Sequence, residues 1–289
     1  MSRIALGTVQ FGLDYGVANQ GGKVSRSEAK KMLALAKENS VTMLDTAMGY
    51  GESENCLGEI GVRGFQVVTK ISSIPQNIER ITDWVAREVE EALARLEIES
   101  LYGVLVHNPE DLLGVNGDIL YKSLLGLKLK GRVKKIGVSV YSPQQLDLLI
   151  PKFQFDIVQA PFNILDRRLF VSGWLEKLND QGVEIHVRSC FLQGLLLMPQ
   201  LQLPLKFDPW IRLFRSWHQW LNDNSVTALK ACLAFSLSFP EISRVVVGAD
   251  CEDQLREIID AEMNLNIKTF PQLQCGDESL INPSNWSKL

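Results

Sequence analysis

Short apolar runs rich in β-branched residues alternate with longer stretches of helical period along the whole chain. Such alternation is typical of a parallel sheet whose strands are joined by crossover helices. The expected strands are Ile4–Leu6, Thr42–Asp45, Gln66–Thr69, Gly103–His107, Lys135–Val138, Ile157–Gln159, Glu184–Val187 and Arg244–Val247. This number of strands matches a closed (β/α)8 barrel. We therefore predict an α/β fold of the TIM-barrel type.

The intervening stretches carry helix signals of their own. In Ile78–Leu96, apolar side chains recur every three or four positions and predict a helix with one buried stripe. Ser25 and Glu28 fit a capping box ahead of a helix at Ala29–Lys37, in which the serine accepts an early amide proton and the glutamate reaches back. No linker rich in Gly, Ser or Pro interrupts the pattern, so we expect a single domain over residues 1–289.

Charge and hydropathy exclude several classes of partner. The net charge of −4 arises from 30 basic and 34 acidic residues spread along the chain, with no basic cluster for nucleic acid. No segment approaches the roughly 18 uninterrupted apolar residues of a membrane span, and the apolar stretch at the N-terminus is too short for a signal peptide. We expect a cytoplasmic protein that acts on a small molecule; its oligomeric state is left open.

Five cysteines lie at wide spacings without a CxxC pair, which predicts reduced thiols and no zinc site. They are Cys56, Cys190, Cys232, Cys251 and Cys275. The three histidines, His107, His186 and His218, are isolated and belong to no metal-binding motif such as HExxH. We therefore predict that the protein holds no metal ion.

Several apolar strands stop at a single polar group. These groups are Asp45, Lys70, His107, Ser139 and Gln159. In a parallel barrel all strands run the same way, so the five side chains are expected to converge on the C-terminal mouth, where barrels carry their chemistry. A single polar residue at a strand end is ordinarily a solvated cap, but polar residues at five strand ends indicate a functional site.

The motifs around these residues extend over essentially the whole chain. Residues 45–54 read Asp-Thr-Ala-Met-Gly-Tyr-Gly-Glu-Ser-Glu. The later motifs are Lys70 in Val-Val-Thr-Lys, His107 in Leu-Val-His-Asn-Pro, Ser139 in Gly-Val-Ser, Gln159 to Asn163 in Gln-Ala-Pro-Phe-Asn, and Gly248-Ala249 followed by Gln254 and Glu257. Together they resemble the aldo-keto reductase superfamily. The resemblance implies a (β/α)8 barrel that binds a nicotinamide dinucleotide without a Rossmann domain, and the chain has no strand-linked GxGxxG.

The resemblance also implies catalytic roles for four residues. Tyr50 would donate a proton to the substrate oxygen while hydride arrives from the cofactor. A phenol ionises near pH ~10 in water, so a nearby cation that favours the phenolate eases this transfer, and Lys70 would supply it. Asp45 would pair with the Lys70 ammonium, and His107 would orient the substrate oxygen.

Cofactor residues follow from the same resemblance. Ser139, Gln159 and Asn163 would bind the nicotinamide carboxamide. The pyrophosphate path would be lined by Ser189, Leu192 and Gly194, and the adenosine end by Gly248, Ala249, Asp250, Gln254 and Glu257.

The chain departs from the family pattern in three places. Val140 stands where relatives commonly carry Asn after the serine, and Arg188 stands where many place an aromatic residue that stacks on the nicotinamide. A guanidinium is planar and can stack in its place. Asp250 occupies the position at which relatives that use NADP(H) present Ser, Arg or Lys. The family precedent still favours NADP(H), with Arg256 as the compensating cation, and NAD(H) is the alternative.

The sequence also admits other functions. Cys190 and His186 lie four residues apart and suggest a nucleophilic hydrolase, although strand alternation does not place them together. A cofactor-binding sensor or regulatory subunit of the same fold is the main competing hypothesis. The segment with Trp217, His218 and Trp220 predicts packing of a loop helix rather than substrate contact, although stacked aromatic residues also admit a sugar or sugar derivative as substrate.

Overall fold

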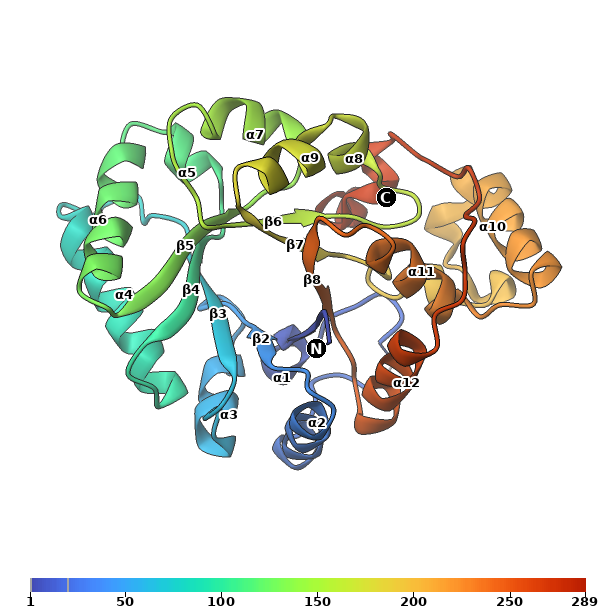
Figure 1. The fold of residues 1–289 in the computed structure, drawn as a ribbon, viewed down its shortest axis with the longest axis horizontal. Helices are drawn as coiled ribbons and strands as arrows, with labels where there is room; N and C mark the ends of the chain where they lie inside the picture. The colour runs from blue at the N-terminus through green and yellow to red at the C-terminus, as the bar shows by residue number, and fades with distance from the viewer. Residues whose placement is uncertain (1, 20) are drawn as a thin grey trace.

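The computed structural model describes residues 2–19 and 21–289. Its strands close a parallel barrel in the order β1 to β8, with β8 paired to β1, which confirms the predicted (β/α)8 fold (Figure 1). The strands are β1 (Ile4–Gly7), β2 (Met43–Asp45), β3 (Gln66–Ile71), β4 (Leu101–Val106), β5 (Val133–Ser139), β6 (Ile157–Pro161), β7 (Glu184–Arg188) and β8 (Ile242–Val247).

Helices surround the barrel as an outer ring (Figure 1). The crossover helices are α2 (Arg26–Glu38), α3 (Ser53–Ile60), α4 (Ile81–Leu96), α6 (Gly117–Leu129), α7 (Pro143–Leu149), α9 (Trp174–Asp180) and α11 (Ala228–Leu237), and α12 (Glu252–Met263) follows the last strand. The loops and the tail add α1 (Val9–Gly12), α5 (Glu110–Leu113), α8 (Arg168–Val171), α10 (Ile211–Asp223) and α13 (Glu278–Ile281), and the 3-10 helices η1 (Leu195–Leu197), η2 (Gln200–Gln202), η3 (Leu205–Trp210) and η4 (Pro283–Lys288). No helix of the described residues is long and apolar enough to cross a membrane.

The inside of the barrel is a packed core and not a channel. Its central cluster consists of Ala5, Met43, Val68, Leu105 and Ile157, which are all buried. A larger core lies between the strands and the helices. The adjacent strands β5 and β6 approach so closely at Gly137 that a Cβ there would lie 2.1 Å from the carbonyl oxygen of Ile157, so no side chain fits. The chemistry is therefore left to the ends of the strands.

Two of the predicted helix starts need correction. The helix expected from Ile78 begins at Ile81, because Arg80 has an extended backbone (φ −128°) and serves as the N-cap. Ser25 caps α2 as expected, accepting from the amide of Glu28 at 3.2 Å. The Glu28 carboxylate does not reach back to Ser25; it accepts from the backbone amide of Glu252 at 2.7 Å and so ties α2 to the start of α12.

The tryptophan segment packs as a structural unit on α10, at the edge of the molecule (Figure 1). Trp217 is buried, stacks on Trp220 with ring centroids 5.8 Å apart, and donates to the carbonyl oxygen of Leu196 at 3.0 Å. The ring nitrogens of His218 lie 2.7 and 3.0 Å from two backbone carbonyl oxygens. The predicted packing role of this segment is confirmed.

Candidate active site

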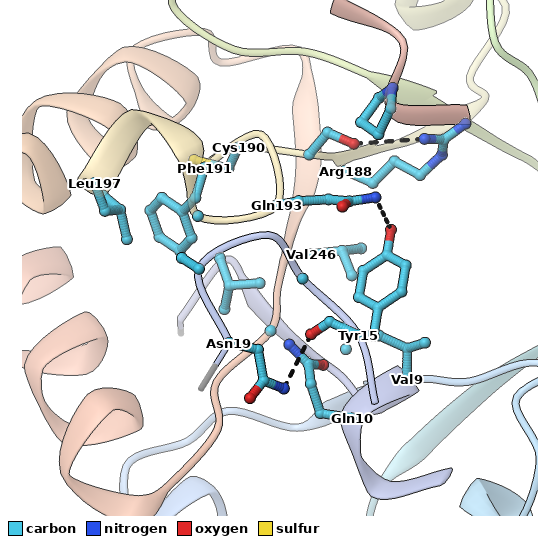
Figure 2. Close-up of a pocket in the computed structure, with 18 of the residues that line it drawn as sticks. Val9, Gln10, Tyr15, Asn19, Arg188, Cys190, Phe191, Gln193, Leu197 and Val246 are labelled. Carbon is cyan, nitrogen blue, oxygen red and sulfur yellow. Dashed lines mark hydrogen bonds between the residues drawn. The ribbon is translucent and has the colours of Figure 1, made fainter. Parts of the chain in front are cut away.

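A cavity of about 800 Å³ opens at the C-terminal mouth of the barrel. It is lined by residues at or after the ends of β1, β2, β4, β5, β6, β7 and β8, and by the tail residues 282–284. Figure 2 shows part of this lining, including Gln10, Tyr15 and Arg188. Four of the five predicted strand-end residues line it directly: Asp45, His107, Ser139 and Gln159. The fifth, Lys70, lies behind Asp45 and is only 1% exposed.

The four residues expected to act on the substrate meet at one place in this mouth. The Lys70 ammonium donates to Asp45 Oδ1 at 2.5 Å and to the carbonyl oxygen of Thr46 at 2.8 Å. Its nitrogen lies 5.0 Å from the centroid of the Tyr50 ring. The Tyr50 and His107 rings meet edge to face with centroids 5.8 Å apart. A phenol, an ammonium, a carboxylate and an imidazole from four stretches of chain thus share one site.

The electrostatics of the site keep Lys70 charged and His107 neutral. Burial by itself would lower the pKa of Lys70, yet the Asp45 carboxylate and then the Tyr50 hydroxyl outweigh it, and the pKa is raised. The pKa of His107 is lowered to about 4, chiefly by burial and further by the positive charges of Lys70 and Arg188. At neutral pH the imidazole is therefore uncharged and can donate one N–H.

The Asp45 carboxylate also connects this group to the residues expected at the nicotinamide. Its Oδ2 accepts from Gln159 Nε2 at 2.7 Å, and Gln159 Oε1 accepts from the Ser139 hydroxyl at 3.3 Å. All these residues are at most 5% exposed. A buried chain of hydrogen bonds therefore fixes the side chains of Gln159 and Ser139 relative to Lys70.

Most of the residues predicted to bind cofactor line the cavity. They are Ser139, Gln159, Arg188, Ser189, Gly194, Gly248, Asp250, Gln254 and Glu257. Asn163, Leu192 and Ala249 do not line it and are buried behind its wall.

The amide of Asn163 is occupied within the protein and was therefore wrongly expected to face the nicotinamide. Its Nδ2 donates to the carbonyl oxygen of Ser189 at 3.0 Å, and its Oδ1 accepts from the amides of Leu165 and Asp166, each at 2.9 Å. Asn163 thus supports the loop after β7 from behind the cavity.

The loop after β1 forms a wall of the cavity that the sequence did not reveal. Gln10 lies over Gly248, where a Cβ would approach its Nε2 to 2.5 Å, and its Oε1 is buried with no partner among the described residues. The Tyr15 hydroxyl accepts from Gln193 Nε2 at 3.0 Å, which joins this loop to the one after β7 across the cavity (Figure 2). β1 ends at Gly7 without an ionisable group, so the signal that marked the other strands was missing.

Arg188 reaches from the end of β7 to the loop after β5. Its guanidinium carbon lies 4.6 Å from the centroid of the Tyr141 ring, and its Nη2 donates to the carbonyl oxygen of Val140 at 3.1 Å. A weaker contact of 3.5 Å joins Nη1 to the Ser189 hydroxyl. One face of the guanidinium is therefore covered by a ring of the protein itself.

The β8 end of the cavity is acidic. Asp250 and Glu257 line it, and burial, partly opposed by hydrogen bonds from Gln254 and Gln10, raises the pKa of Asp250. The expected compensating cation, Arg256, is exposed, pairs with Glu252 at 2.5 Å and lies outside the lining. This end of the cavity therefore presents carboxylates without a facing cation among the described residues.

The hydrolase interpretation finds no support. Burial raises the pKa of the Cys190 thiol to about 12, and its Sγ–H is directed to the carbonyl oxygen of Cys232 at 3.4 Å. His186 instead lies 3.5 Å from the Glu184 carboxylate. Within residues 2–19 and 21–289 no group of His, Cys, Asp or Glu is arranged to hold a metal ion.

Known proteins share both the sequence pattern and the fold. The aldo-keto reductase YhdN of Bacillus subtilis is 25% identical over 68% of this chain, and the match spans only 60% of that relative's own length. The NADH-specific methylglyoxal reductase of Escherichia coli is 23% identical over 92% of this chain and 91% of its own. A holo-form aldo-keto reductase from Bacillus halodurans has the same fold, with a TM-score of 0.74 at 19% identity over 92% of this chain and 88% of its own.

The family model named "Aldo/keto reductase family" matches residues 3–275, which include every strand of the barrel and the four residues Asp45, Tyr50, Lys70 and His107. The chain therefore belongs to the aldo/keto reductase family.

Proposed function

We propose that this protein is a nicotinamide-dependent oxidoreductase that reduces an aldehyde or ketone to the alcohol. The observation that carries the proposal is the meeting of Tyr50, Lys70, Asp45 and His107 at the wall of a cavity of about 800 Å³. A pocket of this size accommodates a large ligand such as a dinucleotide. The bound cofactor would supply the hydride.

The four residues divide the remaining work between them. Tyr50 donates the proton to the carbonyl oxygen as negative charge develops there, and the adjacent Lys70 ammonium stabilises the phenolate that is left behind. Asp45 holds Lys70 charged in a buried position. The neutral His107 imidazole donates a hydrogen bond to the same carbonyl oxygen and orients it.

The cavity residues fit a dinucleotide. The Ser139 hydroxyl and the Gln159 amide, fixed by Asp45, would receive the carboxamide of the nicotinamide. Ser189 and Gly194 would lie along the pyrophosphate, with Leu192 and Asn163 supporting their loop from behind. The unpartnered Oε1 of Gln10 offers an acceptor for a donor group of the cofactor.

At the β8 end, Gly248, Asp250, Gln254 and Glu257 would face the adenosine, and Ala249 would support them. We propose NAD(H), and not NADP(H), as the preferred cofactor. A 2′-phosphate would meet the carboxylates of Asp250 and Glu257, which repel it, and Arg256 is engaged by Glu252. A carboxylate suits the free 2′-hydroxyl of NAD(H), as it does in dinucleotide-binding proteins of other folds.

The test compares the protein with its Tyr50→Phe variant on a panel of small aldehydes. We expect NADH oxidation by the wild type, loss of at least about 1,000-fold in the variant, and equal binding of NADH to both by fluorescence titration. Equal turnover by the variant would overturn the role of Tyr50. Tight NADH binding by the wild type without turnover of any aldehyde would instead support the sensor or regulatory function.

A further inference from the structure

Arg188 is the one lysine or arginine that lines the cavity within residues 2–19 and 21–289. It is half-buried, and none of the carboxylates in these ranges lies within ion-pair distance of it. Removing a cation from water is unfavourable unless a counter-charge or enough acceptors replace the lost hydration. Among the described residues, Arg188 has no such counter-charge.

The guanidinium is nevertheless held in one position. The Tyr141 ring covers one face, and the carbonyl oxygen of Val140 and the Ser189 hydroxyl accept two of its hydrogen bonds. An arginine carries five N–H donors in a rigid planar fork, so donors remain for a further partner. A fork of this shape matches the two oxygens of a carboxylate.

The position of the Arg188 guanidinium in the cavity indicates which ligand would carry the anion. Arg188 lies close enough to His107 that its charge helps to lower the pKa of the imidazole, after burial and Lys70. Its contacts are to Val140 and Tyr141, which directly follow Ser139 at the expected nicotinamide end. An anion bound here would thus lie beside the reacting carbonyl. The other charged residues at the far end of the cavity, Asp250 and Glu257, would repel it.

We propose that Arg188 binds a carboxylate of the substrate, and that the enzyme therefore acts on carbonyl compounds that also carry a carboxylate, such as aldehyde acids and oxo acids. This inference rests on the proposed function and deepens it. The pyrophosphate of the cofactor is the other anion that an arginine in this cavity could bind, and the experiment separates the two.

The experiment uses two pairs of substrates that differ only in charge: 4-formylbenzoate and its methyl ester, and 4-oxobutanoate and its methyl ester. kcat and KM are measured with NADH for the wild type, Arg188→Gln, Arg188→Lys and the control Arg212→Gln, which removes an exposed charge from α10 outside the cavity. The dissociation constant of NADH is measured for each protein by fluorescence.

We expect the wild type to favour each acid over its ester, and Arg188→Gln to reduce the ratio of kcat/KM for acid over ester by about 10- to 100-fold, mainly through KM. Arg188→Lys should keep part of the ratio, because it keeps the charge without the fork. Arg212→Gln should keep all of it. An unchanged ratio in Arg188→Gln overturns the proposal. If acid and ester lose activity equally and NADH also binds more weakly, Arg188 is assigned to the cofactor instead, at its phosphates or at the nicotinamide ring.

Failure of the proposed function gives a different result. If no carbonyl compound is turned over, binding of the unreactive 4-methylbenzoate and of its methyl ester is measured by calorimetry in the presence of NADH. Binding of the acid that is lost in Arg188→Gln but kept in Arg212→Gln supports the carboxylate site without any catalysis. Equal binding of acid and ester, or equal binding of the acid to wild type and Arg188→Gln, overturns it.

Discussion

The Asp45 carboxylate binds Lys70 with one oxygen, at 2.5 Å, and Gln159 with the other, at 2.7 Å. One buried side chain thus fixes both the ammonium beside Tyr50 and the amide expected at the nicotinamide. The two roles proposed for this site, proton donation and cofactor orientation, would therefore both depend on Asp45.

We expect Asp45→Asn to lower the free energy of unfolding by about 3–5 kcal/mol, because it leaves the ammonium of Lys70 buried without its counter-charge. Urea denaturation measures this loss. In the double variant with Lys70→Met the unpaired charge is absent, and part of the stability should return. A double variant as unstable as the single one would show that the ion pair is not the reason.

The lowered pKa of His107 predicts a dependence of stability on pH. The folded state has a pKa of about 4 against the ordinary 6.5, so the unfolded chain binds the proton more readily between these values. The free energy of unfolding should therefore rise with pH from about 4 to 6.5, by up to about 3 kcal/mol from this residue, and stay level above that window. Comparison with His107→Gln by denaturation at several pH values isolates the contribution.

The same lowered pKa affects catalysis. Because His107 stays neutral well below its ordinary pKa, kcat/KM should show no inflection from this residue between pH 5.5 and 7.5. An inflection near pH 6.5 that disappears in His107→Gln would contradict the neutral imidazole.

Asp250 is expected to discriminate against the 2′-phosphate. Asp250→Ser should tighten the binding of NADPH by about fivefold, since it removes one repelling charge in a partly exposed position, and should leave NADH binding equal or weaker. The control Asp253→Asn removes an exposed charge from the first turn of α12, close to Asp250 in the chain but outside the cavity. Fluorescence titration of both cofactors decides the matter: a wild type that binds NADPH more tightly than NADH would disprove the preference.

Cys190 lines the cavity and yet should be inert to alkylation. Its pKa is raised to about 12 by burial, and the thiolate is the reactive form. Incubation of the native protein with iodoacetamide at pH 8 should modify the partly exposed Cys251 and Cys275 and spare Cys190. Peptide mass spectrometry identifies the modified positions, and early modification of Cys190 would mean that the loop after β7 opens readily.

The sequence predicted the barrel and the strand-end residues of the candidate site because both depend on local patterns, whereas Tyr50 was expected from the family resemblance. β-branched runs marked the strands, and an ionisable or amide residue at a strand end marked Asp45, Lys70, His107 and Gln159. Strand direction alone then brought them to one mouth.

Residues brought in by tertiary packing escaped prediction. Gln10 and Tyr15 follow a strand that ends in glycine, which gave no signal of a site. Asn163 was expected to face the nicotinamide because a single sequence does not show whether a side-chain amide binds a ligand or the backbone of a turn. Glu28 likewise had two partners within reach, and contact with α12 prevailed over the local cap.

The contact between Tyr15 and Gln193 bears on how a long ligand enters. Close packing reinforces it, since a Cβ at Gly194 would lie 2.6 Å from the Cβ of Ala18. A dinucleotide lying beneath two loops that touch cannot leave sideways until they separate. Separation of Tyr15 from Gln193 would then limit the rate of the full catalytic cycle. A higher solvent viscosity should therefore slow the enzyme more than replacement of the transferred hydride by deuteride does.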